Sequence, residues 1–120
     1  MTVKAILATK GHSVQTMEPA ATLAEAMHVL DARNIGAVVV VDPRGRVVGM
    51  LSERDIIRRL AEFGPAAFGR TVEQTMTRRV VTCDETATVG DLMEQMTNGK
   101  FRHVPVVRDD GRLVGIVSIG

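Results

Sequence analysis

Residues 38–52 read VVVVDPRGRVVGMLS, and residues 104–118 read VPVVRDDGRLVGIVS. The two stretches are the core of a longer internal match. Residues 14–54 align with residues 80–120 at a constant offset of 66, without a gap and with 13 of the 41 positions identical. Two copies of one supersecondary unit predict a pseudo-symmetric fold with a pseudo-symmetric cleft.

Length and composition limit the class of protein. With 120 residues, 45% of them hydrophobic, the chain can form one domain whose core is shared by both copies, whereas one copy alone would be marginally stable. The net charge of +1 lacks the basic excess of a dedicated nucleic-acid binder, so we expect no nucleic-acid partner. The single cysteine, Cys83, excludes an intramolecular disulfide, and no Cys/His spacing suits zinc.

The distribution of apolar residues argues against export and membrane insertion. No charged-then-apolar leader opens the chain, and the longest uninterrupted apolar run is the five residues 37–41. We therefore expect a cytoplasmic protein with no membrane partner.

Each copy is predicted to open with a short extended segment, at residues 13–17 and 80–83, and to continue as an amphipathic helix. Thr22 and Thr88 lie at equivalent positions, and each precedes an acid by three residues, which is typical of a helix N-cap. The apolar residues that follow recur on one helical face: Leu23, Ala26, Met27 and Leu30 in the first copy, and Val89, Leu92, Met93 and Met96 in the second.

A hairpin follows each helix. Its strands are predicted within residues 37–51 and 103–117, with turns at Gly45 and Gly111. A further helix is expected after the first hairpin, ended by the sequence FGPAAFG at residues 63–69.

The predicted fold class is therefore α/β (α+β), with two β-α-β-β-α repeats. The first repeat covers about residues 12–63, and the second about residues 77–120 with its final helix missing. The connection, at about residues 64–76, includes Thr71–Gln74, which can cap a short helical turn.

This pattern resembles a tandem pair of cystathionine β-synthase (CBS) domains, also called a Bateman module. Residues 49–55, GMLSERD, match the family signature Gly-x-x-Ser/Thr-x-x-Asp, and residues 101–107, FRHVPVV, resemble a strand of its second repeat. The resemblance covers about residues 12–120 and implies a single CBS pair, 1–120, whose copies pack through their sheets. It also implies clefts for adenine nucleotides (AMP, ADP, ATP, NAD or S-adenosylmethionine) and a disk-like homodimer.

In such modules the signature Asp holds the ribose hydroxyls, and the Ser three residues earlier helps to bind the phosphate; here these are Asp55 and Ser52. A carboxylate can accept hydrogen bonds from both vicinal hydroxyls, and Ser52 with the free N–H groups of the following helix start suits a phosphate. The same two residues are also a plausible helix start, with Ser52 as N-cap. Both roles can coexist.

The adenine is expected against the opening strands, near Thr16 and Met17 for one cleft and near Thr82 and Cys83 for the other. Cys83 has an alternative interpretation as a small packed hydrophobe.

The phosphate-binding residues are predicted where the copies differ in charge. The first copy has NIGA at residues 34–37, whereas the second has KFRH at residues 100–103. Lys100, Arg102 and His103 are expected to reach the phosphate of a nucleotide held by Asp55, with Arg54 as a second candidate. Arg102 and His103 could instead form a solvated strand edge. The candidate ligand-binding residues are Thr16, Met17, Val38, Ser52, Arg54, Asp55, Thr82, Cys83, Lys100, Arg102, His103, Pro105 and Ser118.

The second copy lacks its own signature acid, because the sequence ends at Gly120, one residue before the equivalent position. We expect truncation, since residues 113–119 would otherwise form a buried hairpin with no covering helix. The cleft served by Asp55 is therefore expected to be more complete than the one served by Ser118. His12 and His28 have no recognisable partners and are expected at the surface or in packing.

These observations predict a non-catalytic regulatory module that binds an adenine nucleotide and signals to a separate effector protein. The alternative is a structural dimerisation module with vestigial clefts. An enzyme is disfavoured, because the sequence has no Ser/His/Asp order, metal-ligand cluster or glycine-rich phosphate loop. No catalytic cofactor and no metal are expected.

Overall fold

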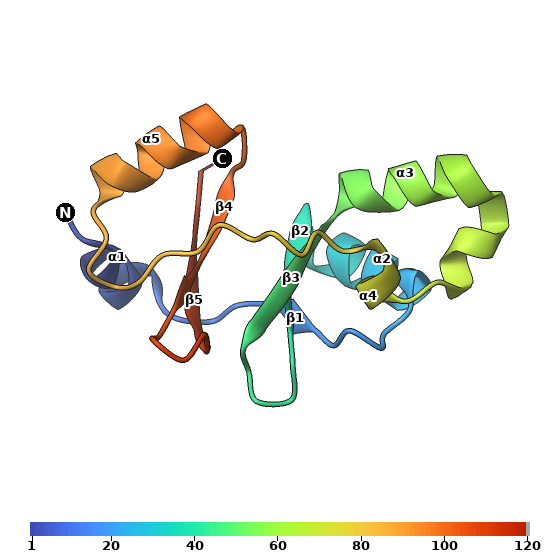
Figure 1. Ribbon diagram of the computed structural model, residues 1–120, viewed down its shortest axis with the longest axis horizontal. Helices are drawn as coiled ribbons and strands as arrows, with labels where there is room; N and C mark the ends of the chain where they lie inside the picture. Colours follow the sequence, from blue (N-terminus) through green and yellow to red (C-terminus); the bar gives the residue numbers. More distant parts are fainter. Residues whose placement is uncertain (120) are drawn as a thin grey trace. The chain divides into compact units, whose positions relative to one another are not determined.

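The computed structural model describes residues 1–119 (Figure 1). Gly120, the last residue of the second aligned copy, lies outside the described residues. Contacts divide the chain into two units. The first-copy unit consists of residues 15–44 and 48–80, and the second-copy unit consists of residues 1–14, 45–47 and 81 onward. The mixed α+β class predicted from the sequence is confirmed.

The first-copy unit contains a three-stranded sheet in the order β1-β2-β3. Strand β1 (Thr16–Met17) pairs in parallel with β2 (Ala37–Val41), with Thr16 opposite Val39. Strand β3 (Val47–Ser52) follows the predicted turn. The β-branched run of β2 is buried at its three central residues because both faces of this strand are covered.

Helices α2 (Leu23–Arg33) and α3 (Glu53–Phe63) contribute the remaining core of the first-copy unit. Helix α3 ends where the glycine- and proline-containing segment was predicted to end it, and a 3₁₀ helix, η1 (Gly64–Gly69), continues the chain. The buried core residues are Met17, Leu23, Ala26, Leu30, Val38, Val40, Leu51, Ile56, Val72 and Met76.

The second-copy unit contains the antiparallel hairpin β4 (His103–Val107) and β5 (Leu113–Ser118), preceded by helix α5 (Val89–Gly99). The extended segment predicted at residues 80–83 is shorter than expected, since only Cys83 forms a bridge, parallel to Val106. Residues 45–47 belong to this unit because Val47 N donates to Gly111 O at 3.0 Å and Leu113 N donates to Gly45 O at 2.9 Å.

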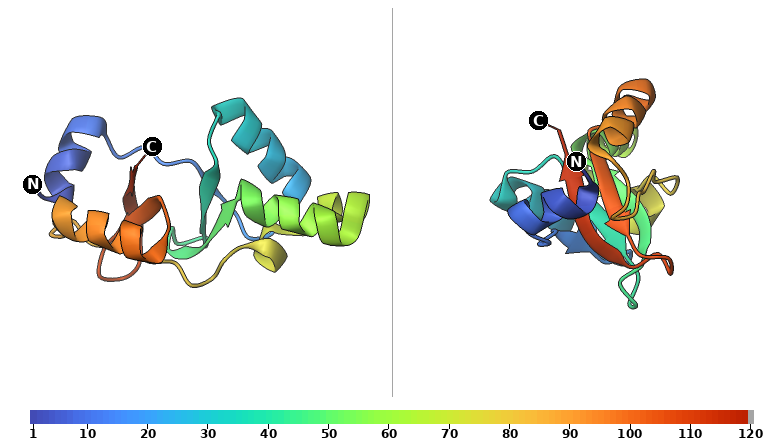
Figure 2. Two further views of the ribbon diagram at one scale, coloured as in Figure 1. Left: turned by 90° about the horizontal axis from the view of Figure 1, so that it is seen from above. Right: turned by 90° about the vertical axis from the view of Figure 1, so that its left-hand side faces the viewer.

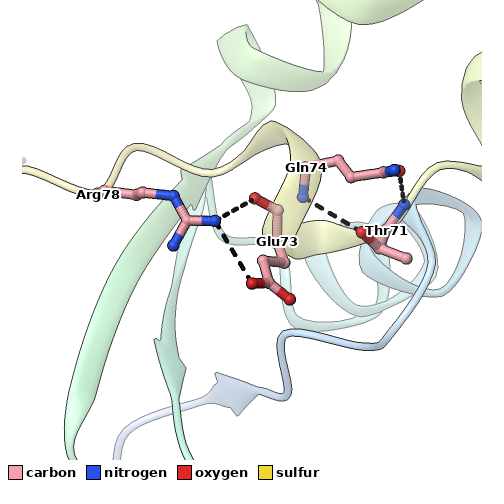
Figure 3. Close-up of polar contacts among 4 residues, drawn as sticks. All are labelled: Thr71, Glu73, Gln74 and Arg78. Atoms are coloured by element: carbon pink, nitrogen blue, oxygen red, sulfur yellow. Dashed lines mark hydrogen bonds and ion pairs between the residues drawn. The ribbon is translucent and has the colours of Figure 1, made fainter.

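The predicted N-caps are confirmed. Thr22 Oγ1 accepts a hydrogen bond from Glu25 N at 3.1 Å, and Thr88 Oγ1 accepts one from Asp91 N at 3.2 Å. The short helix α4 (Val72–Thr75) also begins as predicted, because Thr71 and Gln74 form a reciprocal capping box (Figure 3). This box satisfies two backbone N–H groups that a helix start leaves without intrahelical partners.

Helix α1 (Val3–Lys10) was not predicted, and it covers the second hairpin (Figure 1). Val3 and Leu7 are fully buried with the core of the second-copy unit, and Leu7 lies so close to Gly115 that a Cβ there would be 2.8 Å from its methyl carbons. Figure 2 shows the same helix beside α5 and the hairpin in two further views. The expectation that residues 113–119 lack a covering helix is therefore wrong, because the cover comes from the beginning of the chain.

Helices α1 and α4 are themselves equivalent, at an offset of 69. Val3 N donates to Ala87 O at 2.8 Å, and Val72 N donates to Ala21 O at 2.7 Å. The threonine before each helix is its N-cap. The segment that precedes the first copy thus packs in the second-copy unit, and the segment that precedes the second copy packs in the first-copy unit.

Candidate functional site

Ser52 and Asp55 join strand β3 to helix α3 through a capping box. Asp55 N donates to Ser52 Oγ at 3.2 Å, while Ser52 N donates to Asp55 Oδ2 at 2.9 Å. The Ser52 hydroxyl also lies 3.0 Å from Oδ2, so it can donate to the same oxygen. The capping role predicted for the pair is confirmed. It holds the half-buried carboxylate in one orientation and leaves Oδ1 outside the capping box.

The start of α3 offers fewer free N–H groups than predicted. Glu53 N donates to Gly36 O at 2.9 Å, and Asp55 N is used by Ser52. The reason is that the loop before β2 passes directly over the helix start. A phosphate at this position would depend on side chains such as that of Arg54, which is exposed.

The charged residues of the second copy lie at the junction between α5 and β4. Lys100 ends α5 in the left-handed conformation, with φ of 58°, and the equivalent residue Asn34 does the same with φ of 52°. Lys100 and Arg102 are exposed. For Arg102 this exposure also agrees with the alternative interpretation, a solvated strand edge. Arg102 Nε donates to Ile119 O at 3.2 Å, which leaves the outer nitrogens of the guanidinium outside this bond.

His103 and Ser118 form a side-chain pair across the open end of the hairpin. They are opposite residues in the register of β4 and β5, and His103 Nδ1 lies 2.8 Å from Ser118 Oγ. Burial, and then the nearby Arg102 guanidinium, lower the pKa of His103 below its ordinary value of 6.5. At neutral pH this imidazole therefore supplies a hydrogen bond more than a positive charge.

The sequence could have indicated this pair, because residues placed symmetrically about the turn at Gly111 face each other in a hairpin. The alignment of the two copies gives no indication of the His103–Ser118 pair. The equivalent first-copy residues are Ala37 and Ser52, and Ser52 is bonded to Asp55 instead.

The residues expected near the adenine lie on or beside the strands. The side chains of Met17 and Val38 are buried in the core of the first-copy unit, so only their backbone groups could meet a ligand. Thr16 is half-buried, and its carbonyl accepts a hydrogen bond from Gln15 Nε2 at 3.0 Å. Thr82 is exposed in the second-copy unit.

Cys83 is packed and its backbone is tied to β4. Cys83 N donates to Pro105 O at 3.1 Å, and Val107 N donates to Cys83 O at 2.8 Å. Burial, with a smaller effect of Asp84, raises the pKa of the thiol to about 11. The interpretation of Cys83 as a packed hydrophobe is confirmed by its place against the second-copy core, where Pro105 is buried.

Two surface features were not anticipated. A hollow of about 320 Å³ lies between α2 and α3 in the first-copy unit. Its lining residues are Met27, Leu30, Asp31, Asn34, Ile35, Glu53, Ile56, Ile57 and Leu60. A second, acidic hollow of about 530 Å³ lies at the turn of the second hairpin, beside Asp84 and Asp110.

His12 and His28 are exposed, as expected. Within residues 1–119, no three His, Cys, Asp or Glu side chains gather as a metal site would require. The helices of that same range are all too short or too polar to cross a bilayer.

Comparison with known proteins gives the family. The family model described as CBS domain matches residues 3–62 and 72–120, so it includes α1 and α4. An uncharacterised 17.7 kDa protein of Acidianus ambivalens is 38% identical over 106 residues, which are 88% of this chain and 63% of the relative. The chain spans only 54% and 50% of two further relatives, from Methanopyrus kandleri and Arabidopsis thaliana.

Solved structures agree in fold along almost the whole chain. A CBS-domain-containing protein of Agrobacterium tumefaciens is 46% identical with a TM-score of 0.90, over 99% of this chain and 88% of that one. A CBS domain protein of Pyrobaculum aerophilum complexed with AMP is 26% identical with a TM-score of 0.85, over 98% and 87% of the two chains.

The CBS domain pair of protein MJ0100, in complex with 5′-methylthioadenosine and S-adenosyl-L-methionine, is 33% identical with a TM-score of 0.85, over 98% and 89% of the two chains. The duplicated hairpins, the signature at residues 49–55 and these matches lead to one conclusion. The chain belongs to the CBS domain family and carries two copies of the domain.

Proposed function

We propose that this chain is a non-catalytic regulatory module that binds an adenosine-containing ligand, either an adenine nucleotide or S-adenosylmethionine. The observation that carries the proposal is the orientation of Asp55. Ser52 holds one carboxylate oxygen, while Oδ1 stays outside the capping box and can accept hydrogen bonds from ribose hydroxyls. The AMP complex and the S-adenosylmethionine complex of the two related proteins support this ligand class.

The proposed roles divide by chemistry. In the first-copy unit Asp55 binds the ribose and the exposed Arg54 beside it binds the phosphate of a nucleotide, and in the second-copy unit the exposed cations Lys100 and Arg102 are suited to a phosphate. The adenine meets backbone groups near Thr16, because the neighbouring strand side chains are buried in the core. A separate protein that responds to the bound form would receive the signal, provided that the ligand favours one conformation over another.

Calorimetric titration of the full chain with AMP, ADP, ATP, NAD and S-adenosylmethionine tests the proposal. We expect at least one of them to bind, and Asp55→Ala to weaken that binding roughly 10- to 100-fold, as the loss of a charged hydrogen-bonding partner does. Asp55→Asn is the matched variant, because it keeps a capping oxygen and removes the charge.

Gln74→Ala is the structural control, since it breaks a capping box of the same kind in α4, at a residue with no proposed ligand role. No binding of any of the five compounds would reject the regulatory function. Unchanged affinity in Asp55→Ala would restrict Asp55 to capping.

The hollow between α2 and α3 favours homodimerisation, which is also the basis of the alternative function. Ile57, on α3, is 62% exposed beside this hollow. We propose that Ile57 of a second copy enters it, with that copy's exposed Arg58 facing the acidic rim formed by Asp31 and Glu53. A two-fold interface repeats each such contact.

Light scattering coupled to size exclusion measures this association. Ile57→Glu should shift the protein toward monomer, whereas Val81→Glu, a change at another exposed apolar residue, should leave the mass unchanged. A dimer without ligand binding would support the structural role, and a monomeric wild-type protein would reject dimerisation.

A further inference from the structure

The two asparagines of the sequence lie at the same end of equivalent helices. Asn34 follows α2, and Asn98 is the last residue but one of α5, where the chain turns toward β4 (Figure 1). Both are exposed, and the sequence contains no other asparagine. They differ in the residue that follows, since Asn34 precedes Ile35 whereas Asn98 precedes Gly99.

The Asn98–Gly99 sequence has the chemistry of a cyclisation site. The backbone nitrogen of Gly99 can attack the side-chain carbonyl carbon of Asn98, because glycine carries no side chain beside that nitrogen. The N–Cγ bond forms, the bond from Cγ to Nδ2 breaks, and the Gly99 proton leaves with Nδ2 as ammonia. Water then opens the resulting succinimide at either carbonyl, which yields aspartate or isoaspartate. At Asn34 the β-branched side chain of Ile35 hinders the same attack.

The packing of Phe101 requires the glycine of this sequence. A Cβ at Gly99 would overlap the ring of Phe101. That ring packs against the core of the second-copy unit, and Phe101 N donates to Met96 O at 3.2 Å. The fold therefore keeps residue 99 a glycine, and with it the unhindered nitrogen next to Asn98.

The last turn of α5 is weakly held. A closed helical turn prevents cyclisation, because the N–H groups are directed along the helix axis toward the preceding turn. Thr97, Asn98 and Gly99 are all poorer helix formers than alanine, and no basic residue in this turn interacts with the helix dipole. Lys100 then ends the helix in the left-handed conformation, which is unfavourable for lysine. Because residues 97–100 are also exposed, we expect this turn to open at little cost.

We propose that Asn98–Gly99 is a site of spontaneous deamidation, at which the folded protein converts Asn98 to aspartate and isoaspartate. Water is the only co-reactant, and ammonia is the only product released. The site lies within the second-copy unit and does not depend on ligand binding.

Both products weaken the junction between α5 and β4. Each adds a negative charge at the carbonyl end of α5, where the helix dipole disfavours it. Isoaspartate also adds one carbon to the main chain, between Met96 and the two N–H groups, of Lys100 and Phe101, that donate to Met96 O. We therefore expect the isoaspartyl protein to be less stable than the aspartyl protein.

Peptide mapping of the full chain, after incubation at mildly alkaline pH, tests the reaction. Trypsin cuts after arginine and lysine, so it releases Asn98 in peptide 80–100 and Asn34 in peptide 34–44. We expect peptide 80–100 to gain the mass that replacement of NH₂ by OH adds, as two separable products, and peptide 34–44 to stay unchanged. Fragmentation assigns the gain to Asn98. Asn98→Gln is the matched control, because it keeps an amide but would have to close a larger ring, and it should keep its mass.

The unfolded chain gives the reference rate. We expect Asn98 to react in the folded protein less than about 100-fold more slowly than in urea at the same pH, because opening a helix end costs far less than global unfolding. Stronger protection of Asn98 would reject the site. Conversion of Asn34 as fast as that of Asn98 would reject the role of Gly99.

Melting temperatures test the effect on the junction. Asn98→Asp reproduces the aspartate product and should melt slightly below the wild type. Aged wild-type protein should melt below Asn98→Asp, because it also contains isoaspartate. Aged Asn98→Gln should melt as its fresh form does, which excludes other damage during incubation. A converted wild-type protein with an unchanged melting temperature would overturn the predicted loss of stability.

Discussion

Single residues in equivalent positions of the two copies have acquired different chemistry. Ser52 is fixed by the carboxylate of Asp55, whereas Ser118 is paired with the imidazole of His103. The backbone at Asn34 and Lys100 is left-handed in both copies, so the local geometry was kept while the side chain changed. Asparagine tolerates this conformation better than lysine does, so the second copy adopts it with the less favourable residue.

Thr75 is the clearest case of a residue that costs stability. It is only 6% exposed, and its Oγ1 has no hydrogen-bond partner among residues 1–119. We expect Thr75→Val to raise the free energy of unfolding by about 1 kcal/mol, since it removes a buried unsatisfied hydroxyl at constant shape. Urea unfolding measures the change. The control Thr97→Val, at an exposed residue, should give no gain; a loss of stability in Thr75→Val would contradict the prediction.

Cys83 should be poorly reactive in the folded protein. A pKa of about 11 instead of 9.0 lowers the thiolate fraction at pH 8 by about 100-fold, and the thiolate is the form that reacts. Alkylation by iodoacetamide at pH 8, followed by mass spectrometry, should therefore be slow in native protein and fast in about 8 M urea. Equal rates in the two conditions would show that the thiol is not packed and that its pKa is not raised.

At the scale of elements, the exchange of α1 and α4 explains how each hairpin is covered. Leu7 lies against Gly115, and Met76 lies against the equivalent Gly49. Both glycines are needed because a Cβ would come within 3.0 Å of the neighbouring side chain. Each unit therefore depends on a segment that precedes the other copy in the sequence.

Truncation of Leu7 tests this dependence. Leu7→Ala removes a fully buried side chain and should lower the free energy of unfolding by roughly 2–5 kcal/mol. Ile6→Ala, a half-buried residue on the same helix, is the control and should cost less. In a double-mutant cycle, Leu7→Ala should also relieve part of the clash in Gly115→Ala. A cost below about 1 kcal/mol for Leu7→Ala would show that α1 is not a core element.

At the scale of the whole molecule, His103 makes stability depend on pH. Its pKa is lower in the folded chain than its ordinary value of 6.5, so the unfolded chain binds more protons between the two values. The stabilising contribution is present above pH 6.5 and is lost as the pH falls through the folded pKa.

Urea midpoints measured from pH 8 to pH 5 should therefore decrease on acidification, and His103→Gln should flatten this decrease. His28→Gln, at an exposed histidine, should keep the wild-type slope. If His103→Gln loses stability on acidification as steeply as the wild type, other titratable groups cause the loss of stability at low pH.

The sequence by itself determined the duplication, the two helix–hairpin units, their threonine caps and the Ser52–Asp55 capping pair. All of these depend on local patterns: the spacing of apolar residues, turn glycines and capping residues separated by three positions. A repeated pattern also reinforces itself, since each copy supports the interpretation of the other.

Only the tertiary structure decided that α1 covers the second hairpin, that α4 is its equivalent, and that His103 faces Ser118. The segments of α1 and α4 share few identities, and their offset of 69 departs from the 66 of the main match, so comparison of the sequence with itself does not detect them. Their packing partners are distant in sequence. The physical reason is that burying any apolar surface that fits is favourable, wherever that surface lies in the chain. Local patterns therefore predict the elements but not which elements cover one another.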